Sequence, residues 1–337
     1  MKNAIIYTCR AIFATRPAGN FFRREFAGGG LLALRLRRAI LWRYGRQGNI
    51  AEREDRKMRK VQGAKGFSVP CLGLGTWGFG GRTERDPAND DAGQIAALQA
   101  GIEAGFTLID TAEYYAAGHA ETLVGKAIAG YDRSRLFLTS KLWKNHLRRD
   151  DVRRAAEATL RRLGTDFLDL YLYHQPSDEV PLEETLGAMN ELVAEGMVRA
   201  IGVSNFSAER LRRACRASSA PLALNQYHYN LAVRDVEPEI LDLCRRQGSV
   251  LQAWRPIRDL APSPLTGELC RKYSVSLPQL ALAWLLGKPG VAAVTAMRNP
   301  RHIPEALAAL ELRLAPEEMA ALENSYPFRA PSGVPLR

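Results

Sequence analysis

The chain has 337 residues, of which 46% are hydrophobic and 25% are charged, so it can bury a sizeable core and does not have the composition of a disordered protein. Its five cysteines are an odd number without C-x-x-C spacing, which argues against a disulfide framework or a zinc site, and no apolar run is long enough for a transmembrane helix. The net charge is +11, but residues 1–60 hold 15 of the 47 basic and only 4 of the 36 acidic residues, so residues 61–337 are neutral as a whole.

Residues 1–57 form a basic N-terminal extension. We expect it to be disordered, because such a segment buries too little apolar surface to order itself. Two other interpretations stay open: Phe22-Arg-Arg-Glu-Phe26 is similar to a twin-arginine signal, and an Arg-rich start is typical of organellar transit peptides. Met58 is also a candidate natural start. We expect residues 58–337 to be one domain. Its neutral charge argues against nucleic-acid binding, and the lack of a long apolar run argues against a membrane span. The cysteine pattern favours a reducing compartment, so we expect a cytoplasmic protein.

From about residue 66, short apolar runs alternate with longer helical patterns. The intervals between the ends of the runs are 22 to 41 residues, and a strand, loop, helix and return loop need roughly 30. Eight such units make a chain of the usual length for a (β/α)8 TIM barrel. The expected strand ends are Thr76, Asp110, Lys141, His174, Ser204, Gln226, Trp254 and Thr295.

The helical segments support this prediction. Residues 151–163 carry apolar side chains near the 3.6-residue period, with Gly164 as a C-cap, and residues 182–194 repeat the pattern. The strand runs are continuously apolar, as expected when both faces of a sheet are buried. The alternative is a doubly wound open sheet, but the segment Gly73-Leu-Gly-Thr-Trp-Gly78 lacks its G-x-G-x-x-G phosphate turn.

Four polar side chains follow three consecutive strand runs: Asp110, Tyr115, Lys141 and His174. Because the ends of parallel strands meet at one mouth of a barrel, we expect them to form one site with tyrosine as a proton donor. A lysine ammonium nearby should lower the pKa of the phenol.

A second polar pair, His119 and Glu121, occurs in the helical segment that follows the first of these runs. No further ligand has metal spacing relative to the pair, so we expect a solvated helix face there rather than a metal site.

Six motifs in the expected order carry a family resemblance. They are Leu72-Gly-Leu-Gly-Thr-Trp77, Asp110-Thr-Ala-Glu-Tyr-Tyr115, Thr139-Ser-Lys-Leu-Trp143, His174-Gln-Pro176, Gly202-Val-Ser-Asn-Phe206 and Asn225-Gln226. With these motifs the chain resembles the aldo-keto reductase family from about residue 67 to about residue 322. The resemblance implies a (β/α)8 barrel and the reduction of an aldehyde or ketone to an alcohol with a nicotinamide cofactor, usually NADP(H).

The resemblance also implies roles for matched residues. Tyr115 matches the proton donor, Lys141 and Asp110 the pair that tunes it, and His174 the residue that orients the carbonyl. Trp254 stands where an aromatic residue stacks on the nicotinamide. The expected cofactor-binding residues are Thr76, Ser204, Asn205, Gln226, Trp254 and Arg298, and the expected substrate pocket is formed by Trp77, Tyr114 and Trp143.

The segment around the eighth strand departs from the family pattern. Where the family has Lys, Arg and Asn for the 2′-phosphate and adenine of NADP, this chain has Ala296, His302 and Ala306. In one interpretation Arg298 or Arg301 supplies the positive charge and NADP(H) is kept. In the other the phosphate site is lost and the cofactor binds weakly or is NAD(H).

Arg255, next to the stacking aromatic, replaces a small residue of the family pattern. It either reaches the pyrophosphate of the cofactor or obstructs the loop that closes over it.

The leading function hypothesis is an NAD(P)H-dependent carbonyl reductase that acts as a monomer on a small molecule. The alternative is a cofactor-binding or sensor protein on the same barrel with little turnover. A nucleic-acid-binding protein that uses the basic extension is a third hypothesis, which the neutral body disfavours. The substrate is expected to depend on loops 78–90 and 255–266 and on the tail 324–337.

Overall fold

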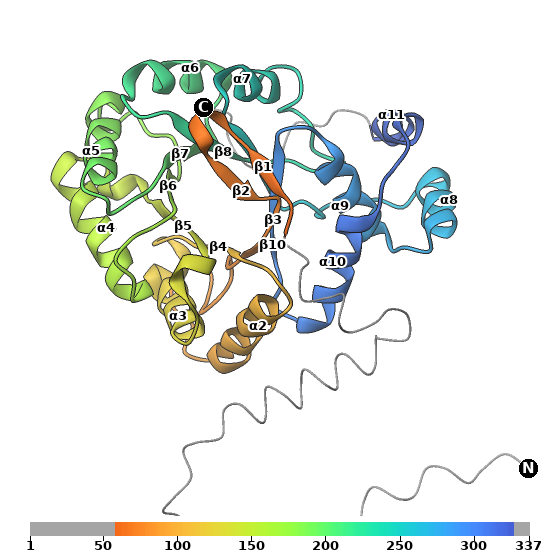
Figure 1. Cartoon of the computed structure of the whole chain (residues 1–337), viewed down its shortest axis with the longest axis horizontal. Coiled ribbons are helices and arrows are strands. Elements are labelled where there is room, and N and C mark those ends of the chain that lie inside the picture. The colour runs from red at the N-terminus through yellow and green to blue at the C-terminus, as the bar shows by residue number, and fades with distance from the viewer. Residues whose placement is uncertain (1–57, 327–337) are drawn as a thin grey trace, which may run out of the picture. The chain divides into compact units, whose positions relative to one another are not determined.

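The structure is a computed structural model that describes residues 58–326. The expectations for residues 1–57 and for the last part of the tail, 327–337, lie outside the described residues. Within the described part, eight parallel strands close into a barrel in the order β10-β3-β4-β5-β6-β7-β8-β9 (Figure 1). The predicted (β/α)8 barrel is therefore confirmed, and the open-sheet alternative is wrong.

Each barrel strand ends at or within two residues of its expected end. The polar residue therefore stands at the carboxyl end of the strand, where the loops of the barrel mouth begin. The strands are β3 (Leu72–Gly75), β4 (Leu108–Asp110), β5 (Phe137–Leu142), β6 (Leu170–Tyr173), β7 (Ile201–Ser204), β8 (Leu222–His228), β9 (Val250–Trp254) and β10 (Val291–Ala296).

The helices surround the barrel and bury their apolar faces against it (Figure 1). In α4, Val152, Ala156 and Leu163 are buried, and Gly164 at φ 65° ends the helix in the left-handed conformation that glycine adopts without strain. The helices are α2 (Asp91–Glu103), α3 (His119–Ile128), α4 (Arg149–Leu163), α5 (Leu182–Ala194), α6 (Ala208–Ala217), α7 (Ile240–Gln247), α8 (Pro264–Tyr273), α9 (Leu277–Gly287), α10 (Ile303–Glu311) and α11 (Pro316–Ser325).

Two helices, α8 and α9, lie between β9 and β10, and they account for the longest interval between the expected strand ends. Each begins with a serine N-cap, Ser263 and Ser276, whose side chain accepts a backbone N–H while the residue three positions on bonds back to the cap. Such reciprocal capping satisfies two helix-end donors and fixes where a helix begins. The two capping boxes thus divide one long connection into two helices.

A hairpin that the sequence did not indicate precedes the barrel. Strands β1 (Lys60–Gln62) and β2 (Ser68–Pro70) pair antiparallel and lie across one end of the barrel (Figure 1). The backbone N–H of Ala64 donates to the carbonyl oxygen of Gly248 over 2.7 Å, and Gly248 lies just before the start of β9. The hairpin therefore covers the amino ends of the strands, opposite the mouth.

The barrel interior is closely packed, and two strand glycines show how closely. A Cβ at Gly202 in β7 would stand 2.4 Å from the carbonyl oxygen of Leu224 in β8. A Cβ at Gly73 in β3 would stand 2.4 Å from the side chain of Leu108. At these positions the neighbouring strand occupies the space that a larger side chain needs, so only glycine fits.

An ionic cluster fastens the loops at the amino ends of β5, β6 and β7. Asp169 is bound by Arg133 over 2.7 Å and by Arg199 over 2.9 Å, and both guanidinium groups lie 4.0 Å from the ring of Phe167. Asp169 also accepts the backbone N–H of Leu138 over 2.9 Å. Ion pairs that share buried backbone partners hold adjacent strands in register, so this cluster belongs to the framework of the barrel.

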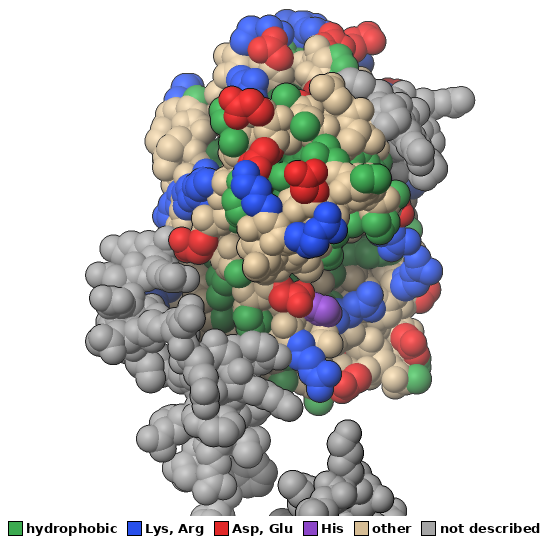
Figure 2. All heavy atoms as spheres, turned by 90° about the vertical axis from the view of Figure 1, so that its right-hand side faces the viewer, with side chains coloured by type: hydrophobic (Ala, Val, Ile, Leu, Met, Phe, Trp, Pro, Cys, Tyr) green, Lys and Arg blue, Asp and Glu red, His purple; other side chains and the backbone are tan. Residues whose placement is uncertain are grey.

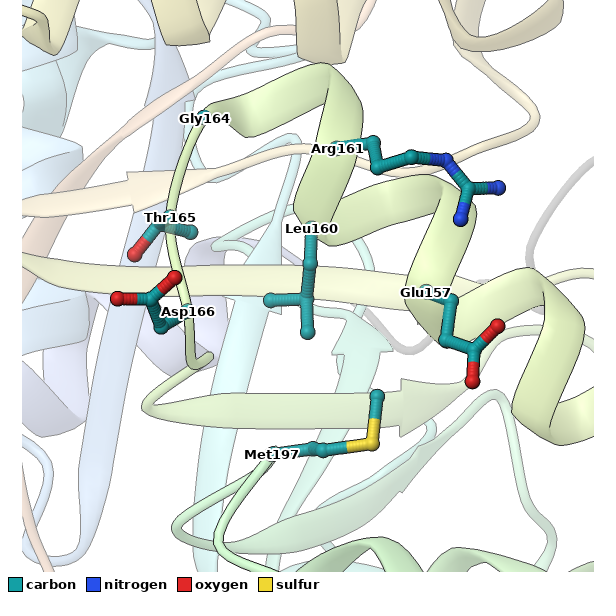
Figure 3. A pocket seen from close by; sticks show the side chains of 7 residues that line it. All are labelled: Glu157, Leu160, Arg161, Gly164, Thr165, Asp166 and Met197. Atoms are coloured by element: carbon teal, nitrogen blue, oxygen red, sulfur yellow. The ribbon is translucent and has the colours of Figure 1, made fainter.

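A shallow depression of about 470 Å³ lies at the same end of the barrel (Figure 3). It is open to solvent and is formed by the last turn of α4, the loop after it and the loop before β7. Its lining residues are Glu157, Leu160, Arg161, Gly164, Thr165, Asp166 and Met197. It lies opposite the strand ends that carry the predicted catalytic residues.

The surface formed around α8, α10 and α11 carries basic and acidic side chains interspersed with one another (Figure 2). Several of them form ion pairs, for example Lys272 with Glu318 over 2.6 Å.

In residues 58–326, no helix has the length and apolar character that crossing a membrane requires.

Candidate active site

The ammonium group of Lys141 lies at the centre of the barrel mouth. Its Nζ donates to Asp110 Oδ1 over 2.6 Å, to the carbonyl oxygen of Thr111 over 2.8 Å and to the hydroxyl of Tyr115 over 3.1 Å. The Lys141 side chain is 0% exposed and that of Asp110 is 4% exposed. The structure thus brings together three of the four predicted catalytic residues in one hydrogen-bonded chain, because β4 and β5 are neighbours in the barrel.

Burial and charge act in opposite directions on these groups. Burial lowers the pKa of Lys141, but the negative charge of Asp110 and the phenol of Tyr115 together raise it above its usual value. Burial raises the pKa of Tyr115, and the charge of Lys141 offsets only part of that rise. Lys141 therefore lowers the pKa of the phenol, as predicted, but the pKa stays above its usual value because desolvation of the phenolate is the larger effect.

His174, the fourth predicted residue, directly follows β6 and faces the same place. Its ring centroid is 5.7 Å from that of Tyr115, with the rings nearly perpendicular at 75°. Burial, with a smaller contribution from the charge of Lys141, holds the pKa of His174 well below its usual value, so the imidazole is neutral near pH 7. Its Nδ1 is buried and has no hydrogen-bond partner among residues 58–326.

The predicted cofactor-binding amides lie beside this network and are joined to it. Gln226 Nε2 donates to Asp110 Oδ2 over 2.7 Å and to Gln252 Oε1 over 2.6 Å. Asn205 Nδ2 donates to Ser204 Oγ over 3.0 Å, and its side-chain oxygen accepts the indole N–H of Trp254 over 3.1 Å. The ends of β7, β8 and β9 therefore form one polar surface next to the Lys141 network.

Thr76 is buried directly after β3 and makes its hydrogen bonds to the protein's own backbone. Its Oγ1 and its backbone N–H both donate to the carbonyl oxygen of Asp110 over 3.0 Å. In the structure it fixes the end of β4, on which Asp110 stands.

Trp254 has a stacking partner that the sequence did not indicate. The ring of His228 lies parallel to it, with centroids 4.3 Å apart and an interplanar angle of 12°. The two residues are direct register partners on the parallel strands β8 and β9, which is the signal that points to the contact once the strands are aligned. Burial and the nearby charge of Arg255 lower the pKa of His228 to about 4, so it stacks as a neutral ring.

The three predicted pocket residues form a continuous aromatic wall. Tyr114 stacks on Trp143 with ring centroids 3.7 Å apart and an angle of 15°, and Trp77 lies nearly parallel to Tyr114 at 6.3 Å. Trp77 also contacts Tyr115 edge to face at 5.0 Å, and Trp143 contacts His174 in the same way at 5.0 Å. The wall therefore borders the predicted proton donor on one side and the imidazole on the other.

Glu113 is a site residue that the sequence did not single out. Its side chain is 7% exposed, and its Oε1 accepts the backbone N–H of Trp143 over 2.5 Å. His146 Nδ1 contacts both carboxylate oxygens at 3.1 Å. The carboxylate thus joins the loop after β4 to the loop after β5.

The segment that departs from the family pattern lies at the edge of the mouth. Ala296 is exposed at the end of β10, and His302, which directly precedes α10, contacts Glu305 in the first turn of that helix at 3.3 Å. Arg298 is exposed, and its guanidinium lies 3.3 Å from the position that a Cβ of Gly78 would take. Arg298, Arg301 and Arg255 form no ion pair with any described residue.

The predicted solvated helix face at His119 and Glu121 is wrong. Glu121 is 0% exposed and is bound by Ser140 over 2.5 Å and by Arg162 over 2.6 Å. Burial raises its pKa in spite of the charge of Arg162. His119 instead pairs with Asp91 at 2.7 Å, and residues 58–326 hold no group of three or more side chains arranged to bind a metal ion.

Comparison with known proteins agrees with the fold and the motifs. The model of the aldo/keto reductase family matches residues 71–259 and 262–327. Methylglyoxal reductase YeaE of Escherichia coli is 36% identical over 285 residues, which cover 82% of this chain and 97% of the relative. The NADH-specific methylglyoxal reductase of the same species is 29% identical, covering 77% of this chain and 95% of the relative.

Among solved structures, the thermostable aldo-keto reductase Tm1743 in complex with the inhibitor epalrestat is 43% identical, with a TM-score of 0.76 and coverage of 79% of this chain and 99% of the other. An aldo/keto reductase of Klebsiella pneumoniae in complex with NADP and acetate is 38% identical, with a TM-score of 0.74 and coverage of 81% and 96%. The family model matches most of the chain and relatives above 30% identity match nearly along their full length. The chain therefore belongs to the aldo-keto reductase family.

Proposed function

We propose that this protein reduces a small aldehyde or ketone to an alcohol with a nicotinamide dinucleotide, and that Tyr115 is the proton donor. The observation that carries the proposal is the contact of Lys141 Nζ with both Asp110 and the Tyr115 hydroxyl at the barrel mouth. Adding hydride to a carbonyl carbon places negative charge on the oxygen, and a general acid close to that oxygen lowers the barrier. The hydride is the chemistry that the dinucleotide supplies when bound.

The raised pKa of Tyr115 suits this role. A phenol whose pKa lies above its usual value keeps its proton near neutral pH and can give it to an oxygen that becomes an alkoxide. Lys141, held charged by Asp110, stabilises the phenolate that remains. The neutral His174 can donate one hydrogen bond to the same oxygen, an interaction of the oxyanion type that is worth roughly 2–4 kcal/mol.

The residues at the mouth fit a nicotinamide dinucleotide. Ser204, Asn205 and Gln226 present a hydroxyl and two amides beside Asp110, which suits the carboxamide of the nicotinamide, and Trp254 provides an aromatic face next to them. The buried Gln252 Nε2 has no hydrogen-bond partner in the part of the chain that the structure describes, so this polar surface has an unused donor there. We assign cofactor binding to these residues.

We propose NADP(H) as the cofactor, with Arg298 as the cation for the 2′-phosphate. The support is that Arg298 is exposed at the mouth and forms no ion pair with a described residue, and that the Klebsiella pneumoniae relative was solved with NADP. The NADH-specific relative from Escherichia coli favours the opposite choice. The two choices make different predictions for a single titration.

The titration follows the fluorescence of the tryptophans as NADPH or NADH is added. NADPH should bind more tightly, and Arg298→Ala should weaken NADPH binding by about tenfold while NADH binding stays unchanged, because one charge-assisted phosphate contact is lost. Arg301→Ala is the matched control. Equal affinity of the unmodified protein for both dinucleotides would contradict the NADP(H) proposal.

Methylglyoxal is the first substrate to test, because two relatives are named methylglyoxal reductases. Consumption of NADPH or NADH with methylglyoxal or a panel of small aldehydes supports the reductase. The second candidate, a dinucleotide-binding or sensor protein, is favoured by Ala296 and His302, which replace charged family residues. Tight dinucleotide binding without turnover of any carbonyl is the result that it predicts.

We further propose that the protein is a cytoplasmic monomer whose working unit is residues 58–337. The strand and helix order of the barrel is complete from β3 to α11 without residues 1–57. A chain that starts at Met58 should keep its turnover, and it should sediment as a monomer. Loss of turnover on this truncation would show that the extension is part of the working unit.

A further inference from the structure

We propose that Glu113 is a positioning residue that fixes Trp143 in the aromatic wall of the substrate pocket, with His146 as its partner. The proposal rests on the proposed function, because Trp143 is taken to contact the carbonyl substrate. It adds a residue that neither the motifs nor the comparisons assign to a role. The carboxylate acts through Trp143 and does not itself touch the reacting atoms.

The Glu113 carboxylate lies between two loops of the barrel mouth. Glu113 stands between Asp110 and Tyr115 in the loop after β4, and its side chain is 7% exposed. It accepts the Trp143 backbone N–H over 2.5 Å and contacts His146 Nδ1 at 3.1 Å through each oxygen. One carboxylate therefore takes hydrogen bonds from two residues of the loop after β5, and it ties that loop to the one that carries Tyr115.

These hydrogen bonds hold one half of an aromatic stack in place. The next residue in the chain, Tyr114, stacks face to face on Trp143 at 3.7 Å. Glu113 is thus the chain neighbour of Tyr114, which provides one ring of the stack. Its carboxylate holds the backbone of Trp143, which provides the other ring. Trp143 also contacts His174 edge to face at 5.0 Å, so the wall that Glu113 holds in place extends to the imidazole.

Loss of the Glu113 carboxylate removes the acceptor of the Trp143 N–H. A backbone N–H in a partly buried loop that loses its acceptor must find another partner or move towards water. The half-exposed His146 can bond to water in place of the carboxylate, whereas the partly buried Trp143 N–H loses the acceptor that holds it. Removal of the acceptor therefore displaces Trp143, whereas a glutamine at this position keeps an oxygen for the same hydrogen bond.

The kinetic test compares Glu113→Ala with Glu113→Gln. A misplaced pocket wall weakens substrate binding in ground and transition state alike, so Glu113→Ala should raise KM for the carbonyl by about tenfold with kcat changed by less than about threefold. Glu113→Gln should keep KM within about twofold. Glu121→Gln is the matched control, because it alters a buried carboxylate outside the pocket and should leave KM unchanged.

A double-mutant cycle separates positioning from general damage. If Glu113 acts through Trp143, then Glu113→Ala should have almost no further effect on KM in a Trp143→Ala background. Equal effects of Glu113→Ala in the two backgrounds would overturn the proposal. Should Glu113→Ala fail to fold, His146→Ala provides the same cycle, with an expected rise in KM of about threefold.

A second readout does not require turnover. In near-ultraviolet circular dichroism of the protein alone, Glu113→Ala should lose the signal that Trp143→Ala loses, because the Tyr114–Trp143 stack is broken, and Glu113→Gln should retain it. An unchanged spectrum in Glu113→Ala contradicts the proposal. If the unmodified protein turns over no carbonyl, the proposed function has failed, and the spectra alone then decide the role of Glu113.

Discussion

At the scale of single residues, the molecule keeps one ammonium group in its interior. Moving a charge out of water costs several kcal/mol, and a buried ion pair that loses one partner destabilises a protein by about 3–5 kcal/mol. Lys141 is tolerated because Asp110, the Thr111 carbonyl and Tyr115 take up its three donors. The same contacts place a charged group beside a phenol, so the stabilisation of Lys141 and the chemistry proposed for Tyr115 have one structural cause.

The pKa directions at this site predict the pH dependence of carbonyl reduction. Tyr115 must carry its proton, so activity is present below its pKa and is lost as the pH rises through it, and the raised pKa places that loss above about 10. The pKa of His174 lies well below its usual value of about 6.5, so the imidazole stays neutral and adds no transition near neutral pH. We expect kcat/KM to be flat between about pH 6.5 and 9.

The measurement is kcat/KM for one aldehyde across that range at constant ionic strength. A fall with an apparent pKa between about 7 and 8.5 would contradict the assignment, since it would require a phenol or imidazole titrating where the structure places neither.

Residue-level contacts between strands were the part of the site that the sequence could not provide. The ends Asp110, Lys141 and His174 were predictable because each polar residue closes an apolar run. The stack of His228 on Trp254 depends on the register between β8 and β9, and the contact of Glu113 with the Trp143 N–H depends on two loop conformations. The register of two strands depends on both strands and on the connection between them, so the sequence of one strand alone does not give it, and it does not give a loop conformation either.

At the scale of elements, the predicted helices agree with the structure because their apolar period is regular and their ends carry glycine or proline. The prediction failed where an element is short or its partner is distant. Strands β1 and β2 have three residues each, too few for a periodic signal, and the hairpin is placed by the bond of Ala64 to Gly248. Glu121 was misplaced because the partner that allows its burial, Arg162, lies on another helix.

Two glycines in helix interiors predict opposite effects of the same substitution. A Cβ at Gly125 in α3 would stand 2.5 Å from the carbonyl oxygen of Arg162 in α4, whereas no neighbouring atom of the described residues lies within 4 Å of a Cβ at Gly187 in α5. Gly187→Ala should stabilise the protein by about 0.5–1 kcal/mol, because alanine loses less conformational entropy in a helix. Gly125→Ala should destabilise it by roughly 1–3 kcal/mol through overpacking.

Unfolding in guanidinium chloride, with each variant compared to the unmodified protein, measures both changes. A stabilised Gly125→Ala variant would show that α3 and α4 separate at little cost, contrary to the close contact in the structure.

Across the whole molecule, the two ends of the barrel hold different kinds of groups. The mouth holds the Lys141 network, the amides of β7 and β8 and the aromatic wall, whereas the opposite end holds the hairpin and the ion pairs of Asp169. This division follows from the parallel arrangement, which brings all carboxyl ends of the strands to one side. The fold was predictable because the repeat spacing sets it, while cofactor choice depends on single side chains such as Arg298.

The central claim is that Tyr115 gives the proton to the carbonyl oxygen. Tyr115→Phe removes only the hydroxyl that Lys141 contacts at 3.1 Å, and the ring can keep its place against Trp77. Turnover of a carbonyl substrate should fall by at least about 10²-fold, the usual contribution of a general acid, while dinucleotide binding measured by fluorescence stays unchanged. A Tyr115→Phe variant that binds the dinucleotide and reduces the carbonyl at the parental rate would contradict the account.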